Sequence, residues 1–510
     1  MEERTIYEIQ SEMRSDALTS LVLTQAYLER IEQIDRRGPK VNSVIETNPD
    51  ALAIAESLDK ERKAGRVRGL LHGIPILLKD NIDTGGQMQT TAGSLALEGS
   101  IAAKDAFIVS RLREAGAVIL GKANLSEWAN FRGARSISGW SSRGGLTRNP
   151  HVLDRTASGS SSGSAAAVAA NLCSVAVGTE TDGSIISPAQ TTGIVGIKPT
   201  LGLLSRSGII PIAHSQDTPG PMARTVTDAA ILLGAMTGID PNDPATHRSR
   251  RCSQQDYSAF LDPDGLKGAR IGVARNLAGT NSNILHIFEA CIKVMKSLGT
   301  VIIDPADVPN ANKFGKTEFE VLLYEFKADL NAYLGSLGKD VPVHSVADVI
   351  AFNEKNAERV MPYFGQEHFL AAQRKGALTS AKYRTALRKN HRLTRAEGIN
   401  AVMKKHRLDA IVAPSGGPAW QVDFANGDQY CTWGVKTTSL SAVAGYPHIT
   451  VPAGMIFGLP VGLSFFGRAL QEPVLIRLAY AFEQATQMRC PPEFRKTADF
   501  KATQRFQAPS

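Results

Sequence analysis

The segment that most constrains this chain is residues 158–199, in which two Ser/Gly-rich turns flank an Ala-rich run. The first turn, SGSSSGS, covers residues 158–164, and the second, TDGS, covers residues 181–184. The Ala-rich run predicts a helix, and a short apolar run follows it before the second turn. Small residues dominate where the backbone must approach another group closely. We therefore expect both turns to lie against another part of the molecule or against a ligand.

The second turn has the composition of a nucleophile site. Hydrolysis of an amide needs an activated nucleophile, a proton shuttle and donors that stabilise the oxyanion. Ser184 directly follows Gly183, and the turn that it ends can aim successive backbone N–H groups at one oxygen. Such a serine needs a base, but His72, His151 and His214 stand alone without a local partner pattern. The sequence therefore predicts Ser184 as the nucleophile and a base other than histidine.

A buried lysine can be that base. Lys79 follows Ile-Leu-Leu in the segment ILLKDN, so its side chain leaves a predicted buried strand. Burial disfavours the ammonium form and lowers the pKa of lysine, which lets it accept a proton near neutral pH. Ser160, in the first turn, can relay the proton between Lys79 and Ser184. Each residue alone is more often structural, and it is the combination that predicts catalysis.

These residues and their flanks resemble the amidase signature family. The matching segments are SGSSSGS, TETDGSI, LLKDNIDT and the stretch from GIVGIKP to ARTVTDAA, and the similarity extends over nearly the whole chain. NLSEWANFRG and SGGPAWQVDFANGD are similar to segments of the peptide-amidase branch. The resemblance implies Ser184 as acyl-enzyme nucleophile, Lys79 as neutral base, and Ser160 as shuttle after a cis peptide bond from Gly159. It also implies an oxyanion hole made by the backbone N–H groups of Thr181, Asp182, Gly183 and Ser184.

The motifs depart from the common family pattern in two places. The usual GGSSGG is SGSSSG here, and the usual DTGGSIR is ETDGSII, with Glu180 and Ile186 at its ends. The ion pair between those ends therefore cannot form, and Asp182 replaces a glycine at the oxyanion hole. The peptide-amidase branch shares these changes, so we interpret them as marks of a subgroup.

The order of predicted elements indicates an α/β fold. Helices are expected at residues 19–36, 50–65, 225–238 and 284–298, and the region 317–406 is mostly helical. Strands are expected at 74–78, 271–274 and 301–303 and in LDAIVAP, HITVPAG and LPVGLSFFG. The segment 126–150, rich in Ser, Gly and Arg, is expected to be a long surface loop. These patterns and the resemblance predict the amidase signature fold, with a large, mixed, twisted β-sheet covered by helices on both faces.

Neither a repeat nor a linker interrupts the chain. We therefore expect a single domain over residues 1–510, with a core at about 5–490 and a polar C-terminal tail at 491–510.

Aromatic residues in loop-like segments are the candidates for a substrate pocket, although packing explains each of them at least as well. These are Trp128, Phe131, Trp420, Phe424 and Trp433. The expected function is hydrolysis of carboxamides to an acid and ammonia or amine, with C-terminal peptide amides or small aryl and aliphatic amides favoured. The alternatives within the fold are an esterase or carbamate hydrolase, or the ammonia-producing subunit of an amidotransferase complex.

Two other classes compete for the first turn. Residues 159–163 satisfy G-x-S-x-G, the nucleophile elbow of α/β-hydrolases, which would make Ser161 the nucleophile. That motif needs a preceding strand, whereas the residues before it, NPHVLDRTAS, are turn-like. A phosphate-binding loop at a helix N-terminus is the second alternative, but no GK[ST] follows and no acidic Mg²⁺ motif is evident.

Composition limits the partners. The chain has 57 basic and 49 acidic residues, a formal net charge of +8, which is modest for 510 residues and does not indicate nucleic-acid binding. The basic stretch 374–407 is expected to be a solvated helix face. Five scattered cysteines lack metal-ligand spacing, and the mechanism requires no cofactor or metal. The sequence shows neither a signal peptide nor a membrane-spanning segment, so we expect a cytoplasmic protein without a membrane partner. Its expected ligands are small-molecule or peptide amides. Its oligomeric state stays open.

Overall fold

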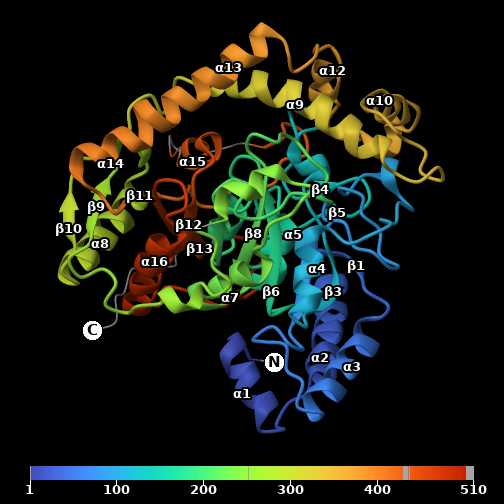
Figure 1. Ribbon diagram of the computed structural model, residues 1–510, viewed down its shortest axis with the longest axis horizontal. Coiled ribbons are helices and arrows are strands. Elements are labelled where there is room, and N and C mark those ends of the chain that lie inside the picture. The colour runs from blue at the N-terminus through green and yellow to red at the C-terminus, as the bar shows by residue number, and fades with distance from the viewer. Residues whose placement is uncertain (1, 251, 429–434, 436, 501–510) are drawn as a thin grey trace.

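The computed structural model describes residues 2–250, 252–428, 435 and 437–500. An 11-stranded mixed sheet forms its centre, in the order β1-β3-β2-β6-β8-β7-β12-β13-β11-β9-β10 (Figure 1). The strands of this sheet are β1 (Val44–Thr47), β2 (Pro75–Lys79), β3 (Val118–Ala123), β6 (Val175–Glu180), β7 (Val195–Lys198), β8 (Thr218–Ala223), β9 (Arg270–Val273), β10 (Val301–Ile303), β11 (Ala410–Pro414), β12 (His448–Ile456) and β13 (Leu459–Phe466). The predicted α/β fold with a large mixed sheet is confirmed.

The helices account for most of the remaining regular structure. They are α1 (Ile6–Arg14), α2 (Ser20–Arg30), α3 (Ala51–Lys63), α4 (Phe107–Glu114), α5 (Ser162–Ala169), α6 (Ile186–Thr191), α7 (Val226–Met236), α8 (Ser282–Ser297), α9 (Gly315–Gly335), α10 (Val346–Lys355), α11 (Ala357–Val360), α12 (Glu367–Gln373), α13 (Ala381–His391), α14 (Asn400–His406), α15 (Thr438–Ala444) and α16 (Glu472–Thr486). Helix α2 begins where the sequence predicts, because the Thr19 hydroxyl caps it by accepting from the N–H of Val22. A short two-stranded sheet, β4 (Trp140–Ser141) and β5 (Gly145–Leu146), lies in the loop before α5.

The connections explain why helices cover both faces of the sheet. The β2–α4–β3 crossover runs towards β1, whereas β3–α5–β6 returns in the opposite direction. Crossovers between parallel strands are right-handed, so α4 and α5 lie on opposite faces. Helix α7 packs against α4 and α16, and α6 packs against α5. Because β2 and β6 are parallel neighbours, their carboxyl ends meet at one edge, where Lys79 and the turn after β6 lie.

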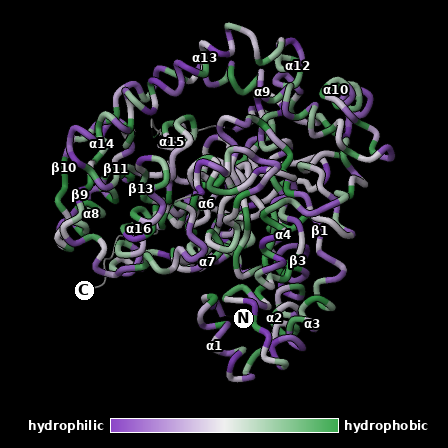
Figure 2. The backbone as a smooth tube through the Cα atoms, viewed as in Figure 1, coloured by the Kyte–Doolittle hydropathy of each residue, from purple (hydrophilic) through white to green (hydrophobic). Residues whose placement is uncertain are grey.

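The predicted helical region 317–406 forms an arm outside the sheet. Helices α9, α10, α12 and α13 run along the top of the molecule in Figure 1. A separate apolar cluster holds α9 to the body, and it includes Phe326, Leu330, Phe369 and Trp128. The outer helix α13 is mostly hydrophilic along its length (Figure 2), and Lys382 and Arg392 are exposed. This arrangement agrees with the solvated face expected for the basic stretch.

The prediction of a surface loop at residues 126–150 is wrong, because most of these residues are buried. Arg132 is fully buried and pairs with Glu127 at 2.7 Å. Its guanidinium also donates to the carbonyl oxygens of Val360 and Phe364 and lies over the Phe364 ring. Small Ser and Gly side chains let this segment pass under the helical arm. The composition that indicates a loop therefore also suits a tightly packed, irregular segment.

The C-terminal tail is attached where it is described. The backbone N–H groups of Phe494 and Arg495 donate to the carbonyl oxygens of Pro150 and His151. Of the helices in the described ranges, none combines the length and the apolar character that crossing a bilayer demands.

Candidate active site

Lys79 and Ser160 meet in the interior of the protein. Lys79 is the last residue of β2, and its Nζ lies 2.7 Å from Ser160 Oγ. The ammonium group also reaches the Thr179 hydroxyl at 2.9 Å and the Thr179 carbonyl at 3.1 Å. Both Lys79 and Ser160 are fully buried. Two of the three residues that the sequence singles out are therefore in direct contact.

The surroundings of Lys79 suit a proton acceptor. Burial lowers the pKa of Lys79 from its usual 10.5 to about 7, while the charges of Asp217 and Glu180 act in the opposite direction. No carboxylate within the described residues forms an ion pair with this lysine. A lysine with a pKa of about 7 is half neutral at neutral pH, so it can take up a proton from a neighbouring hydroxyl.

The first turn is held in place by its small residues. The peptide bond between Gly159 and Ser160 is cis. A Cβ on Gly159 would lie 2.2 Å from Ser126 Oγ, so a larger residue does not fit there. Ser126 donates its backbone N–H to the Ser160 carbonyl, and Ser161 donates its N–H to the Ser184 carbonyl. The last of these bonds joins the first turn directly to the residue expected as the nucleophile.

The second turn leaves its backbone donors unused. None of the N–H groups of residues 181–184 donates a hydrogen bond to a described residue. Gly183 has a φ of 78°, a left-handed conformation that favours glycine. The Glu180 carboxylate accepts the N–H groups of Ile185 and Ile186, and thereby fixes the turn from behind. The Glu180 side chain therefore holds the backbone of this turn, whereas the common family motif has an ion pair at the corresponding positions. Four N–H groups in one turn are available to a ligand oxygen.

A cavity of about 560 Å³ opens beside this turn. Thr181, Asp182, Gly183 and Ser184 all line it. The Ser184 hydroxyl makes no hydrogen bond within the part of the chain that the structure describes. Other parts of its wall come from the first turn, the segment 129–131, α6, the start of α9, the loop 415–420 and the start of α15. A substrate in this cavity would therefore meet Ser184 and the unused N–H groups together.

The five aromatic candidates for the substrate pocket lie in different parts of the structure. Phe131 and Trp420 line the cavity. Trp128 does not, because it is buried against Phe369 in the cluster under the arm. Phe424 lies at the surface beside Tyr363 and outside the cavity lining. Trp433 lies outside the described residues.

The competing nucleophile Ser161 has its hydroxyl fully engaged. Ser161 Oγ donates to the Thr179 carbonyl at 3.0 Å and accepts the Thr179 N–H at 3.2 Å. Its side chain is fully buried and absent from the cavity wall. The residues before it are irregular and do not form the strand that an elbow requires. These contacts give Ser161 a structural role.

Three residues of the site were missed by sequence reasoning. Thr179 contacts Lys79 through two atoms, and Asp217 accepts the Thr181 hydroxyl at 2.6 Å. Glu318, on α9, lines the cavity, and the charge of Asp182 acts on its carboxyl group. Thr179 could have been suspected from its place two residues before the second turn. Asp217 and Glu318 carry no local signal, because only the folded chain brings them to the site.

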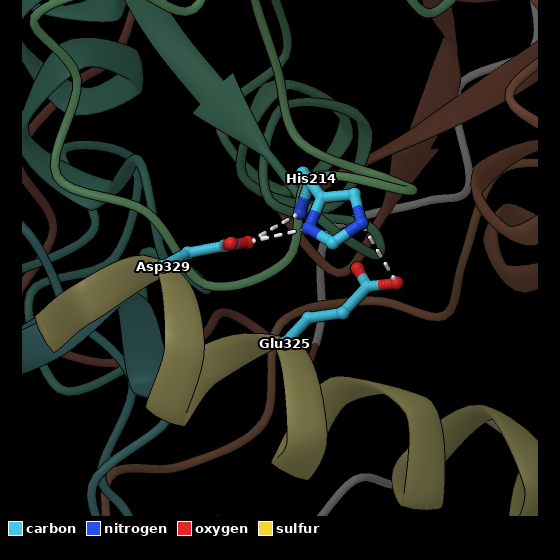
Figure 3. Close-up of side chains that lie close together, drawn as sticks. All are labelled: His214, Glu325 and Asp329. Atoms are coloured by element: carbon cyan, nitrogen blue, oxygen red, sulfur yellow. Dashed lines mark hydrogen bonds and ion pairs between the residues drawn. The ribbon is translucent and has the colours of Figure 1, made fainter. Parts of the chain in front are cut away.

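A second cluster of ionisable groups lies at the base of the arm. The ring of His214 lies between Asp329 and Glu325, both on α9 (Figure 3). Its Nδ1 is 2.8 Å from Asp329 Oδ2, and its Nε2 is 3.5 Å from Glu325 Oε1. The two ring nitrogens face different carboxylates, which suits an imidazolium bridging two anions better than one ion bound by all three. Burial works against the charged ring, but the Asp329 hydrogen bond and the Glu325 charge raise the pKa of His214.

Comparison with known proteins agrees with this geometry. The Amidase family matches residues 22–476. A probable amidase of Arabidopsis thaliana is 46% identical over 97% of this chain and 92% of its own length. A glutamyl-tRNA(Gln) amidotransferase subunit from Thermoanaerobacter pseudethanolicus is 34% identical over 96% of this chain and 98% of its own.

Solved structures give the same result. The native peptide amidase from Stenotrophomonas maltophilia is 50% identical, with a TM-score of 0.91 over 96% of this chain and 99% of that one. The peptide amidase PAM in complex with the competitive inhibitor chymostatin has a TM-score of 0.93 at the same identity and coverage. The chain therefore belongs to the amidase signature family and is a hydrolase of linear amide C–N bonds.

Proposed function

We propose that this protein hydrolyses C-terminal peptide amides, and small aryl or aliphatic amides of similar size, through an acyl-enzyme on Ser184. One observation carries the proposal: a fully buried lysine with a pKa of about 7 is hydrogen-bonded to Ser160, beside a cavity lined by Ser184. The 50% identity to peptide amidases supports the choice of substrate class.

In the proposed mechanism, neutral Lys79 takes the proton of Ser160, which in turn takes that of Ser184. Ser184 Oγ attacks the carbonyl carbon, and the N–H groups of residues 181–184 stabilise the oxyanion. The proton returns through Ser160 to the departing ammonia as the C–N bond breaks. Water, activated by the same relay, then hydrolyses the ester on Ser184 and releases the acid.

Ammonia release from a panel of amides tests the mechanism. Wild type is compared with Ser184→Ala, Ser160→Ala, Lys79→Ala and the matched control Ser161→Ala. We expect losses of several hundredfold or more in the first three variants, because each removes part of the relay, and substantial activity in Ser161→Ala. Loss of activity in Ser161→Ala with full activity in Ser184→Ala would refute the proposal.

The alternatives predict other substrates or a partner. An esterase or carbamate hydrolase would turn over the matching ester or carbamate while leaving every amide of the panel intact. The 34% identity to a glutamyl-tRNA(Gln) amidotransferase component makes a partner-dependent enzyme the second candidate. Such an enzyme would release ammonia only when a partner protein is added, whereas the proposed hydrolase is active as the purified chain.

A further inference from the structure

The described wall of the cavity next to Ser184 contains acidic side chains but no basic one. Among the described residues of its wall, Asp182 and Glu318 are the only ionisable groups. The others are glycine, small hydroxyl residues, amides, aliphatic residues and the aromatic rings of Phe131, Phe314 and Trp420. Cavity walls usually combine apolar surface with a few polar groups that fix the ligand's orientation. Within the described part of this wall, the ionisable side chains that a ligand meets are both acidic.

Asp182 and Glu318 lie in contact, although they come from distant parts of the chain. Their carboxyl groups lie close enough for each to act on the pKa of the other, one in the turn after β6 and the other in the first turn of α9. Ser439 donates to Asp182 Oδ2 at 2.7 Å, and Gln216 donates to Glu318 Oε1 at 3.2 Å. Two carboxyl groups can hydrogen-bond to each other only if one of them keeps a proton.

The environment of the pair favours that single proton. Asp182 Oδ1 is buried and accepts no hydrogen bond from a described residue, although the Thr438 hydroxyl also acts on this carboxyl, so a proton on Glu318 would give Oδ1 a donor. Burial and the nearby Asp182 carboxylate raise the pKa of Glu318 well above its usual value. Lys198 lies behind the turn, where Glu180 and Glu472 face it, and it is not part of the cavity wall. Burial also raises the pKa of Asp182, and a pair that shares one proton presents one negative charge to the cavity.

We propose that the Asp182–Glu318 pair is the specificity site of this cavity: it accepts cationic and neutral amides and rejects ligands that carry a carboxylate. The inference rests on the proposed amidase function and names its substrate class. A substrate with a basic group is attracted by the charge of the pair, and an acidic one is repelled inside a cavity where water screens the interaction poorly.

The same charge acts on the reaction product. Hydrolysis converts a neutral carboxamide into a carboxylate, and it does so beside Asp182. The pair therefore favours the amide over the acid in binding, which discriminates a C-terminal amide from a free C-terminus and promotes release of the product.

The test uses peptide amides of matched size. Two series of N-acetylated dipeptide amides carry Lys, Gln or Glu, either at the residue bearing the amide or at the preceding one. For wild type, we expect kcat/KM at least tenfold higher for Lys than for Gln, and lower again for Glu, in one or both series. The free acid of the Gln peptide should inhibit at least tenfold more weakly than the amide binds.

Variants assign the effect to the pair. Glu318→Gln keeps a hydrogen-bond donor towards Asp182, and the double variant Asp182→Asn with Glu318→Gln removes both acidic groups from the described cavity wall. Ratios of kcat/KM between peptides cancel any general loss of activity. We expect the Lys-to-Glu ratio to fall at least tenfold in the double variant. The matched control is Glu320→Gln, on the same helix but paired with Lys375 and Lys382 outside the cavity, and it should leave the ratio unchanged.

Binding separates failure of this inference from failure of the proposed function. If wild type hydrolyses the Gln peptides but shows no Lys preference in either series, the specificity site is refuted and the amidase function stands. If no amide is hydrolysed, calorimetry with Ser184→Ala still measures the order of affinities. Tighter binding of Lys than Gln and Glu peptides, lost in the double variant, supports the site, and equal affinities refute it.

Discussion

The pH dependence of the reaction follows from the burial of Lys79. A base with a pKa of about 7 is about 9% neutral at pH 6 and about 91% neutral at pH 8. If neutral Lys79 is the base, kcat/KM on a neutral amide should rise about tenfold between these pH values and level off above them. A lysine at its ordinary pKa would instead give a rise of about 100-fold over the same interval and no plateau below about pH 10.

One variant tests whether this rise of kcat/KM with pH reflects the titration of Lys79. The negative charge of Asp217 stabilises the ammonium form, so Asp217→Asn should lower the pKa of Lys79 and move the midpoint by roughly half a unit towards lower pH. Glu320→Gln, which changes a carboxylate of α9 that pairs with Lys375 and Lys382 and acts on neither Lys79 nor Asp217, is the control and should leave the midpoint in place. The assay is ammonia release from an uncharged amide between pH 5 and 10. Lys79 would not be the base if the midpoint of the pH profile stays the same in Asp217→Asn. The same conclusion would follow if kcat/KM of wild type still rises above pH 9.

Three further changes test other parts of the structure. Arg132→Ala should destabilise the protein by about 3–5 kcal/mol, measured by denaturant unfolding, because it leaves Glu127 buried and unpaired; a loss below about 1 kcal/mol would show that the pair is not buried as described. Gly183→Ala should reduce kcat at least tenfold with only a small change in Tm, because alanine avoids a φ of 78° and its Cβ would lie 3.2 Å from Thr438 Oγ1; unchanged kcat would argue against an oxyanion hole at this turn. His214 has a raised pKa, so its stabilising effect is complete below about pH 6.5 and is lost as the pH rises through the raised value. The difference in Tm between wild type and His214→Ala should accordingly be larger at pH 6 than at pH 9, and a constant difference would refute a charged bridge.

Sequence reasoning found the parts of the site that have local signals. Lys79 is preceded by three aliphatic residues, which identifies a buried strand, and Ser184 follows a glycine in a short polar turn. The resemblance implied that Lys79 and Ser160 act together, but the pairing of β2 with β6 that brings Lys79 to the site is seen only in the folded sheet. The assignment of Ser184 and Ser160 as catalytic residues stays a prediction until the variants are assayed.

Sequence reasoning failed where the environment of a residue depends on distant segments. Trp128 looks like Phe131 in the sequence, but its ring faces Phe369 on α12, and only Phe131 reaches the cavity. The segment 126–150 has the composition of an exposed loop, yet the helical arm covers it. The arm itself is separated from the core motifs by more than a hundred residues, so neither its position over the site nor the approach of Glu318 to Asp182 has a counterpart in local pattern.

The carboxyl groups around the site would raise the pKa of Lys79 if all of them were fully charged. Protonation and hydrogen bonds reduce this effect. A neutral Lys79 requires that nearby carboxylates stabilise its ammonium form only weakly, yet Glu180 and Asp217 both act on it. Burial raises the pKa of Asp217 to about 6, and its charge is spread over hydrogen bonds from Thr181, Ile212 and Ala213. Glu180 is likewise neutralised in part by two backbone N–H groups. If the proposed pair at Asp182 also keeps its proton, the oxyanion forms beside one negative charge and not two. An acidic cavity and a neutral Lys79 are therefore compatible only while these carboxyl groups stay hydrogen-bonded or protonated. The charges that would select the substrate therefore also influence the pKa of Lys79.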